Sequence, residues 1–376
     1  MAKFIPLSTP VFDENEKDNI LNAISIGKLA TSGDFIEGFE EAIQQRYQGI
    51  HASVLNSGTS AIHLALKLLG VVKGDEVMCQ SLTFCATANP INYLGASPVF
   101  VDSEVNTWNI CPENLSNAIQ DRISKGKKPK AIIAVDLFGM PAKYDELTEI
   151  SKNFNIPLIE DAAEAMGSSM NGRPCGTFGE FGIFSFNGNK IITTGGGGAL
   201  LSANQKMVEK AKYYSIQARE NYKYYVHNEV GFNYRMNNMS AAIGLAQIGK
   251  LDYKIEKRRS VYQHYQNLLS NIEGITFLDE PNGCFSNRWL SAILIDYKKT
   301  GFSNEDLRLA LLNQNIESRY LWKPLHTQPS FKECLFYGNG VSENLFESGL
   351  CLPSSEDLSL LDQERMVDVI INLLNK

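Results

Sequence analysis

One lysine follows an apolar segment in the run Ser185-Phe186-Asn187-Gly188-Asn189-Lys190, and this run offers reactive chemistry. Residues 181–186 predict a strand that leads into a polar turn presenting Lys190. Glycines at 195–198 then lead into a second predicted strand at 199–202. A lysine held in this way is suited to carry an aldehyde cofactor as an imine. Taken alone, the run is more typical of a surface hairpin with a solvated lysine. The other motifs of the chain are needed to choose between these two interpretations.

A second candidate lies at Asn56-Ser57-Gly58-Thr59-Ser60, between a predicted strand at 51–55 and an amphipathic helix. Small hydroxyl residues and a glycine leave backbone N–H groups free at a positively polarised helix end, which suits a phosphate. The alternative interpretation is a plain N-cap by Ser57 or Thr59.

Strand and helix signals then alternate, and three predicted strands end at the acids Asp102, Asp136 and Asp161. Repeated strand–helix–strand order with nearly continuous apolar strands predicts an α/β fold with a mostly parallel sheet covered on both faces. Ligands of such sheets lie at the carboxyl ends of the strands. A phosphate cradle, an aspartate and a lysine would therefore meet at one edge. A pyridine-ring cofactor with a phosphate and an aldehyde needs these three groups, and Phe84 is either its stacking partner or simply core.

Composition excludes several classes of protein. The 376 residues are 44% hydrophobic and 20% charged, with a net charge of -7, which argues against general nucleic-acid binding. No apolar run reaches membrane-spanning length, and residues 1–10 lack a signal-peptide core, so we expect no membrane association and a cytoplasmic location. The seven scattered cysteines and five histidines show no metal-ligand spacing, so we expect no metal.

The sequence changes character after about residue 250. We expect a large α/β domain with an N-terminal arm at residues 1–245 and a smaller C-terminal α+β domain at residues 246–376. A long helical pattern from Met239 towards Leu269, mildly interrupted by Gly244 and Gly249, is predicted to join them.

The order of the motifs resembles a known family, the pyridoxal-phosphate-dependent sugar-nucleotide aminotransferases of the DegT/StrS type. The resemblance covers nearly the whole chain and implies the aspartate-aminotransferase (type I) fold, with a seven-stranded-type sheet in the large domain. Six segments carry it: Thr31-Ser32-Gly33 with Phe39-Glu40, Asn56-Ser57-Gly58-Thr59, Glu160-Asp161-Ala162-Ala163, Ser185-Phe186 with Lys190, Gly231-Phe232-Asn233-Tyr234-Arg235-Met236, and Trp322-Lys323-Pro324-Leu325-His326.

The resemblance implies a role for each matched position. Lys190 is similar to the Schiff-base lysine that also carries the proton, and Asp161 to the partner of the pyridine nitrogen. The remaining cofactor contacts implied are the phosphate cradle of Gly58, Thr59 and Ser185, the ring-stacking Phe84, and Glu164 and Asn187.

Three further positions are matched outside the cofactor contacts. Asn233 resembles the residue that reaches the phosphate from a neighbouring subunit, which implies a homodimer with shared active sites. Arg235 lies where relatives face the nucleotide's phosphates, and His326 where they approach the sugar. A surface ion pair and a packed histidine are the alternative interpretations of these two residues.

Two positions depart from the family pattern. Gly196 stands where many relatives carry an acid, which is expected to widen or loosen the turn beside the substrate. Glu164 stands where many carry Gln or His near the cofactor's ring oxygen. Two anionic oxygens would repel there, so Glu164 should either carry a proton or turn towards another donor.

The resemblance implies transfer of an amino group from L-glutamate to C4 of a nucleotide-linked 4-keto-6-deoxy sugar, for bacterial surface or glycoprotein glycans. Segments 187–194, 217–221 and 287–291 look most like the branch acting on UDP-2-acetamido-4-keto-2,4,6-trideoxyglucose. The alternatives are dTDP-4-keto-6-deoxyglucose (viosamine) and GDP-4-keto-6-deoxymannose (perosamine).

Two hypotheses of other classes stay open, a dehydratase and a sensor, and an NAD dehydrogenase is a weaker third. A dehydratase on this fold carries histidine in place of Lys190. A catalytically silent sugar-nucleotide sensor would have lost Lys190, Asp161 or Ser185. An NAD dehydrogenase needs a glycine loop that leads into a helix, whereas the glycines here lead into a predicted strand.

Overall fold

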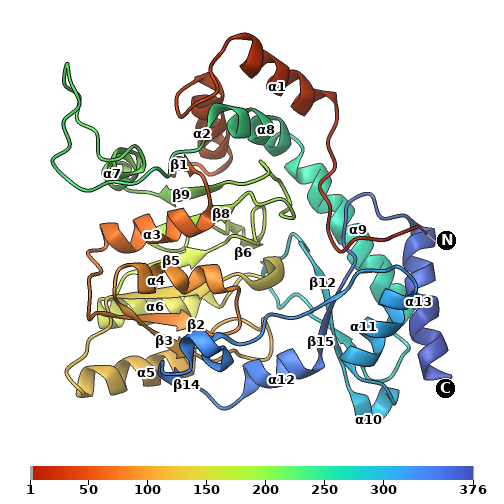
Figure 1. Cartoon of the computed structure of the whole chain (residues 1–376). Coiled ribbons are helices and arrows are strands. Elements are labelled where there is room, and N and C mark those ends of the chain that lie inside the picture. The colour runs from red at the N-terminus through yellow and green to blue at the C-terminus, as the bar shows by residue number, and fades with distance from the viewer. Residues whose placement is uncertain (1–2, 376) are drawn as a thin grey trace.

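The computed structural model describes residues 3–375, and a mixed eight-stranded sheet forms its centre (Figure 1). The strand order is β1-β9-β8-β5-β4-β2-β3-β14. β9 runs antiparallel to both of its neighbours, and the other pairs are parallel. The strands are β1 His51–Leu55, β2 Glu76–Gln80, β3 Ser97–Val101, β4 Ala131–Val135, β5 Leu158–Asp161, β8 Phe181–Ser185, β9 Gly198–Ser202 and β14 Phe336–Tyr337.

Helices cover both faces of this sheet, and the alternation of side chains along β4 shows why its sequence is apolar throughout. Ile133 packs in the cluster that contains α3 and α7, whereas Ile132 packs against α5 and α6 on the opposite face. A strand buried on both faces needs apolar residues at every position. The helices of this part are α1 Glu14–Ser25, α2 Asp34–Arg46, α3 Gly58–Leu68, α4 Asn89–Tyr93, α5 Pro112–Ser124, α6 Tyr144–Phe154, α7 Gln205–Ser215 and α8 Asn238–Ile248.

The single helix expected from 239 to 269 is two helices, α8 and α9 Leu251–Leu269. Gly249 ends α8, and the Lys250 amide bonds the Gln247 carbonyl at 3.0 Å in a tightened turn. Glycine is a weak helix former. The Lys250 ammonium at this break reaches both carboxylate oxygens of Glu16, at 2.8 and 2.9 Å.

A second, antiparallel sheet lies in the C-terminal third, in the order β10-β12-β15-β13. Its apolar face packs with α9, α11 and α13 around Tyr265, Leu307 and Met366. The elements are β10 Ile275–Phe277, β12 Ser291–Ile295, α10 Tyr297–Thr300, α11 Asn304–Asn313, β13 Arg319–Tyr320, α12 Val341–Ser348, β15 Gly349–Leu352 and α13 Leu360–Leu374. A small third sheet joins β6 Ser169–Met170, β7 Arg173–Pro174 and β11 Cys284–Phe285.

The fold is the expected mostly parallel α/β architecture, with one strand more than the seven-stranded type. The extra strand, β14, comes from the C-terminal third and pairs with β3, Phe336 opposite Phe100. The chain therefore returns to the large sheet after β13. The expected boundary between two domains near residue 245 stays a prediction. No helix among residues 3–375 combines the length and apolar character needed to cross a membrane.

Candidate active site

A cavity of about 470 Å³ opens beside the carboxyl ends of β5 and β8. Eight of the residues expected at a cofactor site line this one cavity. They are Gly58, Thr59, Phe84, Asp161, Glu164, Ser185, Asn187 and Lys190.

Lys190 enters the cavity from the turn after β8, where its amide bonds the Asn187 carbonyl at 3.0 Å. Its Nζ lies 3.3 Å from Oε1 of Glu164 and 3.8 Å from the ring centre of Trp289. A carboxylate and an aromatic face both attract an ammonium group. The amine is thus held inside the cavity, and the solvated-hairpin interpretation does not apply to it.

Asp161 is the last residue of β5 and is buried at the cavity wall. Its Oδ2 accepts a hydrogen bond of 2.7 Å from Oγ1 of Thr87, and its Oδ1 a longer one of 3.3 Å from the Ala163 amide. Burial raises the pKa of Asp161, and the charge of Glu164 adds to this rise. A cationic donor in the cavity would stabilise the Asp161 carboxylate.

The first turn of α3 faces the same cavity. Ser57 is its N-cap, because its Oγ accepts from the Ser60 amide at 3.0 Å. The Gly58 and Thr59 amides are the first donors of the helix, at its positively polarised end. A Cβ on Gly58 would come within 3.3 Å of the Ser185 Cβ, so glycine lets the helix end approach β8 closely. The N-cap and the phosphate cradle were considered as alternatives for this segment, but here Ser57 caps the helix while the Gly58 and Thr59 amides face the cavity, so both can apply.

The glycine run shapes the opposite wall. A Cβ on Gly198 would lie 2.4 Å from the Gly58 amide nitrogen, and one on Gly197 would lie 2.3 Å from Oγ1 of Thr194. Gly195 has a φ of 77°. Gly196, by contrast, lines the cavity and would place a Cβ in open space. The structure therefore leaves room for a side chain at the position where many relatives carry an acid.

Several cavity residues were not expected from the sequence, and four of them have side chains that contact the site residues or add a charge. Thr87 bonds Asp161, and Trp289 lies under Lys190. Trp322 contacts the half-exposed Phe84, with ring centres 5.2 Å apart, and Arg319 reaches the cavity from β13. Trp322 belongs to one of the six segments that carry the family resemblance, and Trp289 belongs to segment 287–291, which resembles one branch of the family.

Three predicted residues do not line the cavity. The Arg235 guanidinium pairs with Glu40 at 2.5 Å. His326 lies between Oγ of Ser81, at 2.7 Å, and Glu343, at 3.0 Å, and its ring stacks on Phe336. The roles proposed for Arg235 and His326 in substrate binding stay predictions.

Asn233, the third of these residues, lies near the rim of the cavity. Its carbonyl accepts from Nδ2 of Asn56, a cavity residue, and its side chain is exposed to solvent.

The other two strand-end aspartates serve the scaffold. Asp102 accepts backbone hydrogen bonds at the start of α12. Asp136 lies with Glu160 and Cys175 in a buried group whose potential ligand atoms are within 4.8 Å of one another. Burial raises the pKa of Asp136 to about 7, and burial and Asp136 together raise that of Glu160. This pair therefore favours retaining a proton, and it lies outside the cavity lining.

Comparison with known proteins agrees with this geometry. The DegT/DnrJ/EryC1/StrS aminotransferase family matches residues 10–371. EpsN of Bacillus subtilis, whose name proposes a pyridoxal phosphate-dependent aminotransferase, is 45% identical over 379 residues, covering 100% of this chain and 97% of that protein. GDP-perosamine synthase of Escherichia coli O157:H7 is 34% identical, covering 95% of each chain. A UDP-4-amino-4,6-dideoxy-N-acetyl-beta-L-altrosamine transaminase of Campylobacter jejuni is 31% identical, covering 97% of this chain and 96% of that protein.

Solved structures agree as well. A DegT DnrJ EryC1 StrS aminotransferase from Brucella abortus superposes with a TM-score of 0.90 at 29% identity, covering 96% of each chain. The pyridoxal phosphate form of the sugar aminotransferase Spr1654 from Streptococcus pneumoniae, described as putative, gives 0.90 at 25% identity, covering 99% of each chain.

The fold and the cavity define an aminotransferase of the type I class. The chain belongs to the DegT/DnrJ/EryC1/StrS aminotransferase family, and it is a pyridoxal-phosphate-dependent sugar aminotransferase. The residues present fit this cofactor. A buried carboxylate with acceptor capacity left, an amine and an open helix N-terminus surround one cavity, as a pyridine nitrogen, an aldehyde and a phosphate require.

Proposed function

We propose that this protein transfers the amino group of L-glutamate to C4 of a nucleotide-linked 4-keto-6-deoxy sugar. The preferred substrate is UDP-2-acetamido-4-keto-2,4,6-trideoxyglucose, and the product serves glycan synthesis from the cytoplasm. One observation carries the proposal: the Lys190 amine and the Asp161 carboxylate line the same cavity as the N-terminus of α3.

Each group has a distinct task in this proposal. Pyridoxal phosphate, when bound, supplies an aldehyde that takes up the amino group and a ring that accepts electrons. Asp161 keeps the ring nitrogen protonated, and its burial strengthens that ion pair. The Gly58 and Thr59 amides with Ser185 hold the phosphate. Lys190 moves the proton that fixes the new C–N centre.

The relatives support the substrate class. Two of them are named for the synthesis of GDP-perosamine and for a transaminase of a UDP-linked 4-amino-4,6-dideoxy sugar. These names differ in the nucleotide, so GDP-4-keto-6-deoxymannose is the second candidate. The UDP sugar is preferred because segments 187–194, 217–221 and 287–291 most resemble the branch that uses it.

A homodimer with shared sites completes the proposal. A long connection between α7 and α8 projects beyond α7 (Figure 1) and exposes Tyr222, Tyr224, Tyr225 and Val230, each more than 60% accessible. Exposed apolar side chains grouped in this way favour a protein contact. Asn233 lies on the same connection, with its side chain free to reach a second copy.

Visible absorbance tests the proposal directly. Wild type, Lys190→Ala and the exposed-lysine control Lys206→Ala are each loaded with pyridoxal phosphate and recorded before and after addition of L-glutamate. We expect a visible band that shifts with glutamate in wild type and in Lys206→Ala, and no lysine-dependent band in Lys190→Ala.

The aminated sample is then mixed with UDP-, GDP- and dTDP-linked 4-keto sugars, and the sugar that restores the original band fastest identifies the nucleotide. The proposal fails if wild type shows no band that depends on Lys190. Restoration by the GDP sugar alone would replace the UDP assignment with the perosamine one.

A further inference from the structure

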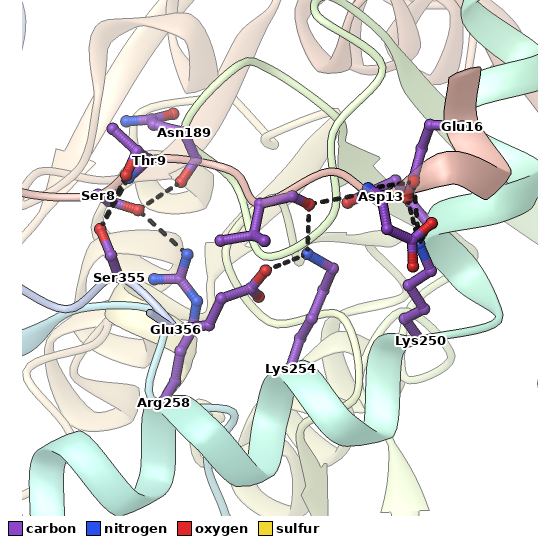
Figure 2. A network of polar contacts seen from close by, with 12 residues as sticks. Ser8, Thr9, Asp13, Glu16, Asn189, Lys250, Lys254, Arg258, Ser355 and Glu356 are labelled. Atoms are coloured by element: carbon purple, nitrogen blue, oxygen red, sulfur yellow. Dashed lines mark hydrogen bonds and ion pairs between the residues drawn. The ribbon is translucent and has the colours of Figure 1, made fainter. Parts of the chain in front are cut away.

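The segment from Ser8 to Glu16, called here the N-terminal strap, crosses α9 and reaches the turn that carries Lys190. Figure 2 shows its polar contacts. Glu16 and Asp13 bind Lys250 at one end of the strap. At the other end, Oγ of Ser8 donates to the carbonyl of Asn189 at 3.0 Å. Residues far apart in sequence thus meet at the peptide bond that precedes Lys190.

The Asn189 carbonyl is fixed by two donors. Besides Ser8, the indole Nε1 of Trp289 donates to it at 2.7 Å. Because a peptide unit is planar, holding this carbonyl also fixes the amide nitrogen of Lys190. The ring of Trp289 simultaneously lies 3.8 Å from the Lys190 Nζ. The orientation of the Lys190 backbone therefore depends on Ser8 and Trp289.

Arg258 of α9 links these two donors. Its Nη1 donates to the carbonyls of Trp289, at 2.6 Å, and Ser354, at 3.0 Å, and its Nη2 donates to Oγ of Ser8 at 3.2 Å. Arginine has no acceptor. The Ser8 hydroxyl must therefore accept from Arg258, which leaves its own hydrogen for the Asn189 carbonyl. The direction of the hydrogen-bond chain is set by the chemistry of its members.

Arg258 is suited to a fixed role because it is buried, with 1% of its surface exposed. Burial lowers its pKa to about 10, so it remains charged at neutral pH. The charges of Glu356 and Asp357 partly offset this effect of burial, and Glu356 also binds Lys254, one turn before Arg258, at 2.5 Å.

We propose that Ser8 and Arg258 are positioning residues that hold the Asn189 carbonyl and thereby aim Lys190 into the cavity. The proposal rests on the function proposed above for Lys190. It adds that the N-terminal strap and α9 take part in setting the reactive turn, although neither contributes a side chain to the cavity lining.

The test compares Ser8→Ala with Thr9→Val. Thr9 belongs to the same strap, but its Oγ1 pairs with Oγ of Ser355, at 3.2 Å, and not with the Asn189 carbonyl. Ser8→Thr retains a hydroxyl and serves as the conservative rescue. Hydrogen exchange of residues 187–194 is measured in the cofactor-free protein, together with the rate at which the Lys190-dependent band appears on addition of pyridoxal phosphate.

In Ser8→Ala we expect exchange about fivefold faster and band formation about fivefold slower than in Thr9→Val, the factor that corresponds to roughly 1 kcal/mol for one hydrogen bond. Ser8→Thr should match wild type, and the thermal midpoints of the two strap variants should agree. Arg258→Lys keeps the positive charge but has fewer hydrogen-bond donors. It should make exchange of residues 187–194 faster still and formation of the visible band slower still. Equal exchange and equal rates in Ser8→Ala and Thr9→Val would overturn the proposal. A wild type without the band would instead contradict the function proposed for Lys190.

Discussion

Each carboxylate oxygen of Glu164 has a hydrogen-bond donor in this structure. Its Oε1 faces the Lys190 amine at 3.3 Å, and its Oε2 accepts from the amide of Phe138 at 2.7 Å. Phe138 has a φ of 54°, which is uncommon for a residue with a side chain. Glu164 is thus turned towards donors of this chain, which is one of the two arrangements expected for this position. Glu164 thus supports a strained turn as well as the reactive amine.

Substitution at this position separates the two tasks. Glu164→Gln retains an acceptor for the buried Phe138 amide, whereas Glu164→Ala leaves that amide without a partner. We expect Glu164→Ala to lower the free energy of unfolding by about 2 kcal/mol and Glu164→Gln to lower it by less than about 1 kcal/mol. Urea unfolding of the cofactor-free proteins measures both. Equal losses in the two variants would show that Glu164 does not stabilise the Phe138 turn.

The roles of single residues could be predicted where a combination of side chains suits few chemical functions. A lysine and an aspartate at strand ends beside a helix start pointed to one cofactor, and both line the cavity. Arg235 was harder, because its nearest carboxylate, Glu40, lies 195 positions away in sequence. Arg319 reaches the cavity from β13 of the second sheet. Tertiary packing brings it there, so no local sequence pattern predicts this position.

Secondary-structure elements followed from local patterns wherever both faces of a strand are buried. The strand predicted at 51–55 is β1, and β4 coincides with an unbroken apolar run. β14 escaped prediction because two residues carry no periodicity. Asp102 contacts β14 and the helix after it. Its amide donates to the carbonyl of Tyr337 at 3.0 Å, and its carboxylate accepts from the amides of Val341, at 3.0 Å, and Ser342, at 2.9 Å, at the start of α12.

Asp102 makes the attachment of α12 sensitive to pH. Burial alone would raise the pKa of this carboxyl, but hydrogen bonds from Ser342, Ser103 and Asn339 lower it overall. A lowered pKa in the folded state stabilises the protein above the ordinary value of about 4, and this contribution is lost as the pH falls through the folded-state value. The contribution is therefore fully present at neutral pH.

We accordingly expect Asp102→Asn to lower the free energy of unfolding by about 2 kcal/mol at pH 7, because an amide nitrogen would face backbone donors. The difference from wild type should narrow below about pH 4. Denaturant unfolding at a series of pH values measures it, with Asp75→Asn, on an exposed turn, as the control. A difference that stays constant down to pH 3 would contradict this origin.

At the scale of the whole molecule, the exposed connection between α7 and α8 predicts that one copy completes the site of another. We expect Lys190→Ala and Asn233→Ala to be inactive or severely impaired alone and to recover activity when they are unfolded together and refolded. In a hybrid, the subunit that keeps Lys190 receives the partner's Asn233. About a quarter of wild-type activity should return, because half of randomly formed dimers are hybrids with one intact site.

Mixtures of each variant with wild type calibrate this recovery, and light scattering checks the mass of the species formed. Mixed samples that stay as inactive as their parents, although dimers form, would show that Asn233 acts within its own chain.

The late pairing of β14 with β3 has a consequence for how the protein is made. A ribosome delivers seven strands of the central sheet before Phe336 and Tyr337 emerge. Until then β3 is an open edge, and open edges pair readily with other chains. Amino-terminal parts of a chain generally fold first during synthesis, so this sheet gains its final edge strand only after the other seven strands have been made. The edge of β3 therefore stays unprotected while residues 102–335 are being made.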